Sequence, residues 1–202
     1  ADHAGAFWVG LAFSLGLFVK IGALGFHGWM PDTYSESPAP VSAVLGATSV
    51  MLSTYTMARL LPPFQPVLQA ISGWFMLWAL ATILYAGVMA LVQKDTKRLV
   101  AYLSMSQMNY CVLGVFTYVA NGVLGSISYS ISHGLAIGLL FLVSGALLYR
   151  TGTRDMDKMG GLAEKLPIAI LATMAGFLTI GGVPPAVGFK SKFILLSGAM
   201  VR

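Results

Sequence analysis

Long apolar segments, separated by short polar stretches, are the feature that most constrains the fold of this chain. Six such segments run over residues 4–30, 41–61, 67–92, 99–119, 122–149 and 167–200. A membrane-spanning helix needs ~20 apolar residues, and backbone groups in lipid can find hydrogen-bond partners only within the protein. We therefore predict an all-α membrane protein, a polytopic helical bundle of about six spans.

The charged residues are too few for a water-facing surface. Asp, Glu, Lys and Arg make up 9% of the 202 residues, against about 25% in a soluble domain. This composition excludes both a soluble globular domain and a disordered chain. The single cysteine, Cys111, excludes a disulfide framework and a cysteine-based metal site. The excess of 12 Lys and Arg over 7 Asp and Glu fits basic residues beside a lipid bilayer, and no nucleic-acid partner is expected.

The positions of the basic residues predict an orientation. Most lie in two loops on the same side, residues 93–98 and 150–166, and the positive-inside rule places these loops in the cytoplasm. The chain is then a multi-pass protein of the cell membrane or another energy-transducing membrane. Residues 32–40, with two prolines, are predicted to form a turn on this side. Apolar sequence runs almost to both ends of the chain, so we expect a fragment of a longer protein.

Two segments carry breaks. The first reads LFVKIGALGFHGWMP and the last reads TIGGVPPAVGFKSKFILL. Glycine frees the backbone, and proline removes a donor and leaves a carbonyl unpaired four residues earlier. Paired interrupted spans in two halves of a sequence are typical of transport sites in inverted-repeat transporters. The predicted structural breaks lie at Gly22, Gly25, Pro184 and Pro185.

Each break lies beside a lysine. A lysine at the bilayer centre costs a few kcal/mol, so we interpret Lys20 and Lys192 as functional rather than as side chains that reach the interface. Lys190, two residues from Lys192, would point to another face of a helix, where a plain interfacial charge suffices.

A polar stripe runs along the fifth segment. Ser126, Tyr129, Ser130 and His133 recur at the spacing of one helix face. The stripe could hold water and pass protons, or it could join helices by hydrogen bonds, and the sequence favours neither. His27, at the end of the first segment, could form the entry to a pathway. No phosphate loop, metal-ligand spacing or nucleophile with a base is present, so the sequence predicts no catalytic site and no cofactor in this chain.

Several motifs, in order, resemble one family. FHGWMPDTYSESPAPVSAVL (Phe26 to Leu45) and QKDTKRLVAYLSMSQMNYCVLG (Gln93 to Gly114) resemble the FHxWLPDAHxEAPxPVSAxL and QxDxKRxxAYSSISQxG stretches of antiporter-like, proton-conducting subunits. SHGLAIGLLFLVSGAL, GTRDMDKMGGL and GGVPPAVGFKSKFILL complete the series. Such subunits occur in respiratory complex I (NADH-quinone oxidoreductase), membrane-bound hydrogenases and multisubunit sodium/proton antiporters.

The resemblance implies a fold and a set of site residues. The family has about fourteen helices in two inverted five-helix repeats, each with one broken helix. Residues 1–202 would then form part of a proton-antiporter-like domain, with 1–61 ending the first repeat and 67–202 making most of the second. Lys20 and Lys192 match the lysines of the two broken helices, and His133 matches the histidine of a conducting helix.

Two departures leave the function open. Met51, four residues before Tyr55, and Ile137, four residues after His133, occupy positions where the family keeps lysines. The leading hypothesis is an ion-translocating subunit, with protons as the expected ion, in a redox-driven respiratory or hydrogenase-type complex. Its partners would be other membrane subunits, which hold the redox chemistry. The alternatives are a sodium/proton antiporter subunit without a redox partner and a structural subunit impaired in conduction.

Overall fold

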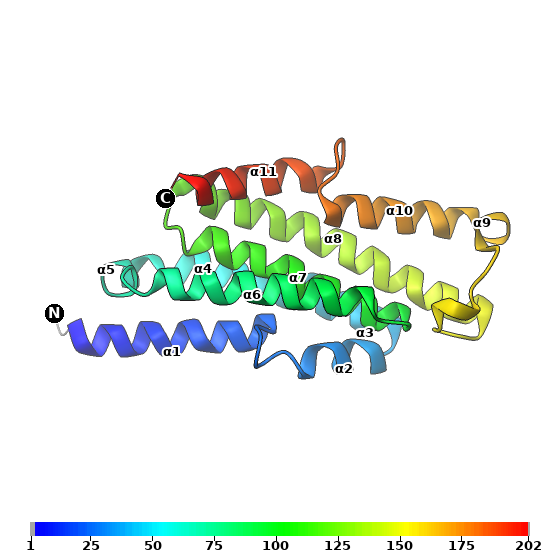
Figure 1. Cartoon of the computed structure of the whole chain (residues 1–202), viewed down its shortest axis with the longest axis horizontal. Helices are drawn as coiled ribbons and strands as arrows, with labels where there is room; N and C mark the ends of the chain where they lie inside the picture. Colours follow the sequence, from blue (N-terminus) through cyan, green and yellow to red (C-terminus); the bar gives the residue numbers. More distant parts are fainter. Residues whose placement is uncertain (1–2, 202) are drawn as a thin grey trace.

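The computed structural model describes residues 3–201, and this part of the chain is helical with no β-strand (Figure 1). The prediction of an all-α fold is confirmed. The helices are α1 (His3–Ile21), α2 (Trp29–Glu36), α3 (Ala39–Val44), α4 (Val50–Leu60), α5 (Gln65–Leu68), α6 (Ser72–Leu91), α7 (Thr96–Val115), α8 (Ala120–Thr151), α9 (Leu162–Lys165), α10 (Pro167–Gly181) and α11 (Val187–Met200).

Three helical stretches within residues 3–201 are long and apolar enough to cross a membrane. They are Ala39–Leu60, which joins α3 to α4, and then α6 and α8. The first and last segments contribute only shorter apolar helices, Gly5–Ile21 and Pro167–Gly181, because each segment is interrupted. The segment over 167–200 is thus two helices.

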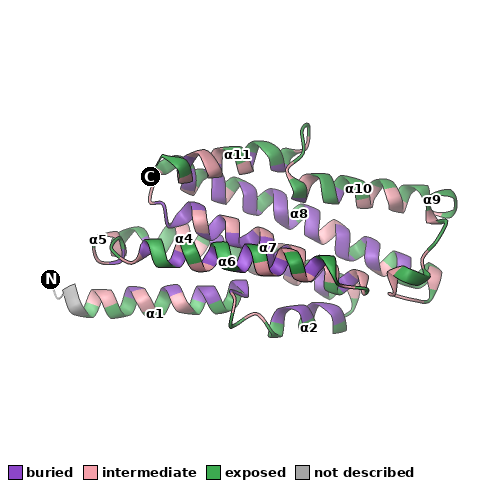
Figure 2. Cartoon of the chain, viewed as in Figure 1, coloured by how far each residue is buried: buried purple, intermediate pink, exposed green. Residues whose placement is uncertain are grey.

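The two interrupted segments lie on opposite sides of the bundle in Figure 1. The pair α1 and α2 runs end to end along one side, and the pair α10 and α11 runs end to end along the other. The remaining long helices lie between them. Figure 2 shows buried residues along α7 and α8, whereas exposed and intermediate residues predominate on the outer helices α10 and α11. The broken helices therefore pack against a central layer that includes α7 and α8.

Aromatic rings join the first segment to this central layer. The Phe75 ring of α6 stacks on Phe116, with centroids 4.7 Å apart. Phe18 of α1 packs against Phe75 at 5.1 Å and against Phe116 at 5.9 Å. Such ring pairs add to the energy of burial, so this cluster helps to fix α1 against α6 and α7.

Glycines let α11 approach the backbone of α8. A Cβ atom added at Gly125 would lie 2.4 Å from the Leu195 backbone nitrogen, and one at Gly198 would lie 2.2 Å from the Gly122 nitrogen. Close backbone contact of this kind is the usual way for helices to associate in a membrane, where apolar side chains gain little by leaving lipid. The position of Lys192 on α11 follows from this contact.

Polar contacts tie three loops together at one end of the bundle. Arg154 Nη1 donates to the Ser35 carbonyl at 2.6 Å, and Arg154 Nε lies 3.2 Å from Asp95 Oδ2. The buried Lys97 ammonium donates to the carbonyls of Ser35 and Ser37. These contacts confirm that residues 93–98 and 150–166 lie at the same end, beside the end of α2.

The prediction of a turn over residues 32–40 is wrong for most of this range. α2 continues from Trp29 to Glu36, and only Ser37 and Pro38 separate it from α3. Proline is well tolerated in the first turn of a helix, where its missing donor costs nothing. The sequence also gave no indication of the π-helical turn Leu45–Ser49 between α3 and α4.

The contact between α8 and α11 can be tested with matched glycine variants. We expect Gly125→Ala to lower the unfolding free energy by about 1–3 kcal/mol, because the new methyl group overlaps the Leu195 backbone. Gly16→Ala in α1 is the control, since a Cβ there meets nothing within 4 Å and alanine favours a helix. Thermal unfolding of the full-length protein in detergent gives the comparison. Equal stability of the two variants would contradict the packing described.

Candidate functional site

The second helix break holds Lys192. α10 ends at Gly181, Gly182 follows with φ +70°, and α11 begins at Val187, so the break predicted at Pro184 and Pro185 is confirmed. Pro184 has no backbone donor for the Ile180 carbonyl four residues before it. Lys192 Nζ donates to this carbonyl oxygen at 2.8 Å. The lysine therefore satisfies a backbone group that the break leaves free.

Two tyrosines face the same ammonium group. Lys192 Nζ lies 4.8 Å from the ring centroid of Tyr110 on α7 and 5.3 Å from that of Tyr129 on α8. The Tyr129 hydroxyl donates to Gln107 Oε1 at 2.8 Å and lies 3.3 Å from the Ile180 carbonyl. Aromatic rings at this distance attract a cation, so these contacts hold the ammonium between α7, α8 and the break.

His133 extends this group of side chains along α8. It is buried, its ring centroid lies 6.2 Å from that of Tyr129, and its Nε2 lies 3.1 Å from Ser104 Oγ. Nδ1 of His133 has no hydrogen-bond partner among the described residues. An ionisable ring and an ionisable amine thus lie near the same tyrosine. We call Ser104, Gln107, Tyr110, Tyr129, His133 and Lys192 the Lys192 cluster.

At the first helix break, side chains of α6 form hydrogen bonds with the backbone. Gly22 (φ +78°) and Gly25 (φ +93°) adopt a backbone conformation that favours glycine, so this predicted break is also confirmed. The Leu24 amide donates to Thr82 Oγ1 at 3.0 Å, and Trp78 Nε1 donates to the Leu24 carbonyl at 2.8 Å. Both backbone groups of Leu24 are therefore paired by side chains one helical turn apart.

The other predicted site residues lie outside the Lys192 cluster. His27 Nε2 lies 3.1 Å from the Tyr85 hydroxyl beside the first break. Lys20 is exposed on the last turn of α1. Ser130 Oγ donates to the Ile127 carbonyl of its own helix at 2.8 Å. The structure thus brings Lys192 and His133 together and leaves Lys20, His27 and Ser130 elsewhere.

The two positions that lack lysines differ in their surroundings. Met51 on α4 is 38% exposed, whereas Ile137 is fully buried. A Cβ added at Gly46, in the π-helical turn, would lie 2.7 Å from Ile137 Cγ2. The space around Ile137 is therefore filled by apolar packing.

The sequence did not indicate Tyr110 as a site residue, and it indicated no specific role for Tyr129 or Gln107. For Gln107 and Tyr110, the spacing of polar residues in the sequence could have indicated a shared site. Ser104, Gln107 and Tyr110 are each three residues apart, which places them along one side of α7.

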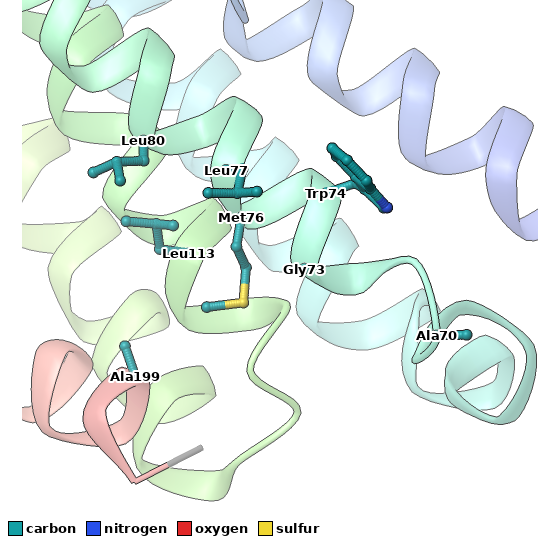
Figure 3. Close-up of a pocket in the computed structure, with 8 residues that line it drawn as sticks. All are labelled: Ala70, Gly73, Trp74, Met76, Leu77, Leu80, Leu113 and Ala199. Carbon is teal, nitrogen blue, oxygen red and sulfur yellow. The ribbon is translucent and has the colours of Figure 1, made fainter.

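A large apolar hollow lies away from the cluster. About 610 Å³ opens between the N-terminal part of α6, Leu113 of α7 and Ala199 of α11 (Figure 3). Its lining is apolar and includes Trp74, Met76 and Leu80. Such a surface suits lipid or another helix and offers nothing to an ion.

Comparison with known sequences gives one family over the whole chain. Residues 1–202 match the family described as NADH:quinone oxidoreductase/Mrp antiporter, TM. The chain is 36% identical over 192 residues to NADH-quinone oxidoreductase subunit N of Desulforudis audaxviator. This match covers 92% of the chain and 38% of that relative. The chain is also 36% identical over 190 residues to F(420)H(2) dehydrogenase subunit M of Methanosarcina mazei, with coverage of 93% and 38%. The chain thus spans well under half the length of these relatives.

Solved structures agree in fold. A chain of respiratory complex I from Thermus thermophilus matches with a TM-score of 0.90 and 32% identity, over 97% of this chain and 42% of that one. A chain of the Mrp complex from Dietzia sp. matches with a TM-score of 0.84 and 25% identity, over 95% of this chain and 36% of that one. The expected membrane fold, part of a polytopic helical bundle, is confirmed.

The pairing at the first break predicts the effect of a conservative change in α6. Trp78→Phe keeps an aromatic ring but removes the donor to the Leu24 carbonyl. We expect a loss of about 1–3 kcal/mol in unfolding free energy, the cost of a buried acceptor without its partner. Trp74→Phe is the control, because Trp74 is 74% exposed. Thermal unfolding distinguishes the two, and the interpretation fails if both variants unfold alike.

Proposed function

Because this chain belongs to the NADH:quinone oxidoreductase/Mrp antiporter transmembrane family, we propose that it is part of an ion-translocating membrane subunit that moves protons through Lys192. The subunit would work in a redox-driven respiratory or hydrogenase-type complex. Other membrane subunits of that complex would be its partners and would carry out the redox chemistry.

The observation that carries this proposal is the setting of the Lys192 ammonium. One carbonyl accepts its hydrogen bond and two tyrosine rings attract its charge, so these contacts offset part of the cost of holding a charge inside an apolar bundle. Lysine shifts its protonation readily when it is moved out of water. A lysine held by interactions of moderate strength can therefore take up a proton and release it again.

The rest of the cluster supports protons rather than sodium as the ion. Its ionisable groups are an amine, an imidazole and two phenols, and none of its six residues carries a carboxylate, which hard cations favour as a ligand. His133 and Ser104 lie 3.1 Å apart beside Lys192 and would extend the pathway along α8. Water between polar side chains would complete it, with Ser130 as one candidate.

The first break would supply the neighbouring part of the pathway. His27 and Tyr85 lie together there, and Lys20 is on the helical turn just before it. We infer that residues 1–61 end one inverted repeat and residues 67–202 form most of the next, with one broken helix in each. Charge on one lysine would then influence the other through the low-dielectric bundle.

The basic end of the bundle would face the cytoplasm, with residues 93–98 and 150–166 in its loops. These loops are held to each other by charge. Lys94 Nζ lies 2.6 Å from Asp157 Oδ2, and this hydrogen bond raises the pKa of the exposed Lys94 ammonium above its usual value. A single ion pair in water contributes little to stability, but it adds to the contacts of Arg154 and Lys97.

A conduction-impaired structural subunit is the second candidate. The buried, closely packed Ile137 favours it, because an apolar side chain cannot carry a proton at the position where the family resemblance leads us to expect a lysine. A sodium/proton antiporter subunit without a redox partner differs from the first proposal in the subunits that purify with it.

The proposal predicts that Lys192→Met abolishes most of the proton flux carried by this subunit. Methionine fills similar space but holds no proton. The measurement is proton uptake per electron by the reconstituted whole complex. Lys190→Met is the matched control, since Lys190 is exposed two residues away, and it should leave the stoichiometry unchanged. An unchanged stoichiometry in the Lys192 variant would contradict the proposal and favour the structural alternative.

We expect a lysine to change the unfolding free energy differently at positions 137 and 51. Ile137→Lys should lower the unfolding free energy by about 3 kcal/mol, because it introduces a charge into an apolar site. Met51→Lys should be tolerated, because Met51 is 38% exposed. Thermal unfolding of both variants checks the difference, and equal losses would show that Met51 is as enclosed as Ile137. Proton flux in Met51→Lys adds a second readout, since the structural alternative predicts no change.

A further inference from the structure

A basic hollow lies where α8 ends and α10 begins. It encloses about 390 Å³, and its lining includes Arg150 from the end of α8, Lys158, and Lys165 from α9. Lys158 Nζ lies 3.5 Å from Asp155 Oδ2. Arg150 and Lys165 form no ion pair with the described residues, and the neighbouring Glu164 does not line the hollow. The hollow therefore carries an excess of positive charge that this part of the chain does not neutralise.

An apolar groove continues from this hollow along the bundle. It encloses about 490 Å³ between α8 and α10, and Lys165 and Leu166 line both spaces. Leu142 and Ala146 form part of one wall, and Ile168 and Ala172 form part of the other. From Arg150 in the hollow back to Leu142 in the groove, the two spaces together follow α8 for about 12 Å, at 1.5 Å per residue.

The order of these two spaces matches the order of a bilayer. The basic hollow lies at the ends of α8 and α10, which is the level of the lipid headgroups for helices that cross the membrane. The groove runs from there toward the middle of α8, and so into the hydrocarbon layer. A cationic space is thus joined to an apolar one at the depth where a phospholipid changes from phosphate to acyl chain.

We propose that the hollow and the groove form one binding site for an anionic phospholipid. Its phosphate would lie among Arg150, Lys158 and Lys165, and one acyl chain would lie between α8 and α10. Basic pockets between transmembrane helices recognise anionic headgroups through charge and hydrogen bonds to phosphate oxygens. This site is separate from the Lys192 cluster and does not depend on ion conduction.

The shape of the site favours a lipid over a soluble phosphate. A free phosphate could bind in the basic hollow, but it has no apolar part that would occupy the adjoining groove. A zwitterionic phospholipid could fill the groove, but its own cationic group would compete with the three basic side chains. A lipid with net negative charge satisfies both parts at once.

The experiment measures phospholipid retained by the whole complex. Complex exchanged into mixed micelles with equal phosphatidylglycerol and phosphatidylcholine is washed and analysed by native mass spectrometry. We expect selective retention of phosphatidylglycerol by the wild type. Arg150→Gln alone should weaken it about fivefold, and the triple variant R150Q/K158Q/K165Q on the order of a hundredfold. Arg59→Gln is the control, because Arg59 is an exposed cation near the end of α4, and it should change nothing.

A second variant tests the groove. Ala146→Phe fills the groove without altering charge, and it should also reduce phosphatidylglycerol retention. Excess glycerol 3-phosphate, a headgroup without acyl chains, should displace little of the lipid. The proposal is overturned if the wild type retains both lipids equally, or if Arg150→Gln and the triple variant match Arg59→Gln. It is overturned in favour of a soluble-phosphate site if Ala146→Phe has no effect while glycerol 3-phosphate competes fully.

Discussion

The pairing of backbone groups at the two helix breaks is the constraint on which the rest of this structure depends. A break inside an apolar bundle exposes amides and carbonyls that lipid cannot satisfy. At the second break, Lys192 donates to the Ile180 carbonyl, and the Tyr129 hydroxyl lies 3.3 Å from the same oxygen. At the first break, Thr82 and Trp78 pair with both backbone groups of Leu24. Each break is thus stable only because a neighbouring helix or the following helix provides polar side chains within hydrogen-bond distance of its backbone groups.

This requirement links the fold to the site. Lys192 reaches the Ile180 carbonyl because α11 packs directly on the backbone of α8, through glycines such as Gly125. The same contact brings Tyr129 beside the lysine, and His133 follows one turn later on α8. The group that satisfies the backbone is therefore also the group that we propose as the proton carrier. The basic hollow at the other end of α8 adds a separate role for this helix at the membrane surface.

The sequence was sufficient to predict the helical class and the two breaks, and it singled out Lys192, which the structure places at the second break. These features depend on local chemistry, namely apolar length, glycine and proline, and an ionisable group in an apolar run. The tyrosine contacts were not predictable, because Tyr110 and Lys192 are far apart in the sequence and meet only through the packing of α7 and α11. Periodicity placed Ser130 on the stripe with His133, but its hydroxyl bonds its own helix instead. The extension of α2 was missed because prolines at helix starts resemble prolines in turns.

The choice between a proton carrier and a fixed structural cation rests on the chemistry of one side chain. Arginine at position 192 would keep a positive charge and hydrogen-bond donors, but it does not release its proton in proteins. The most direct measurement is therefore proton uptake per electron by the reconstituted whole complex carrying Lys192→Arg. Loss of this subunit's share of the proton flux, with electron transfer still catalysed, is the expected result. A flux equal to that of the wild type would show that Lys192 only stabilises the helix break.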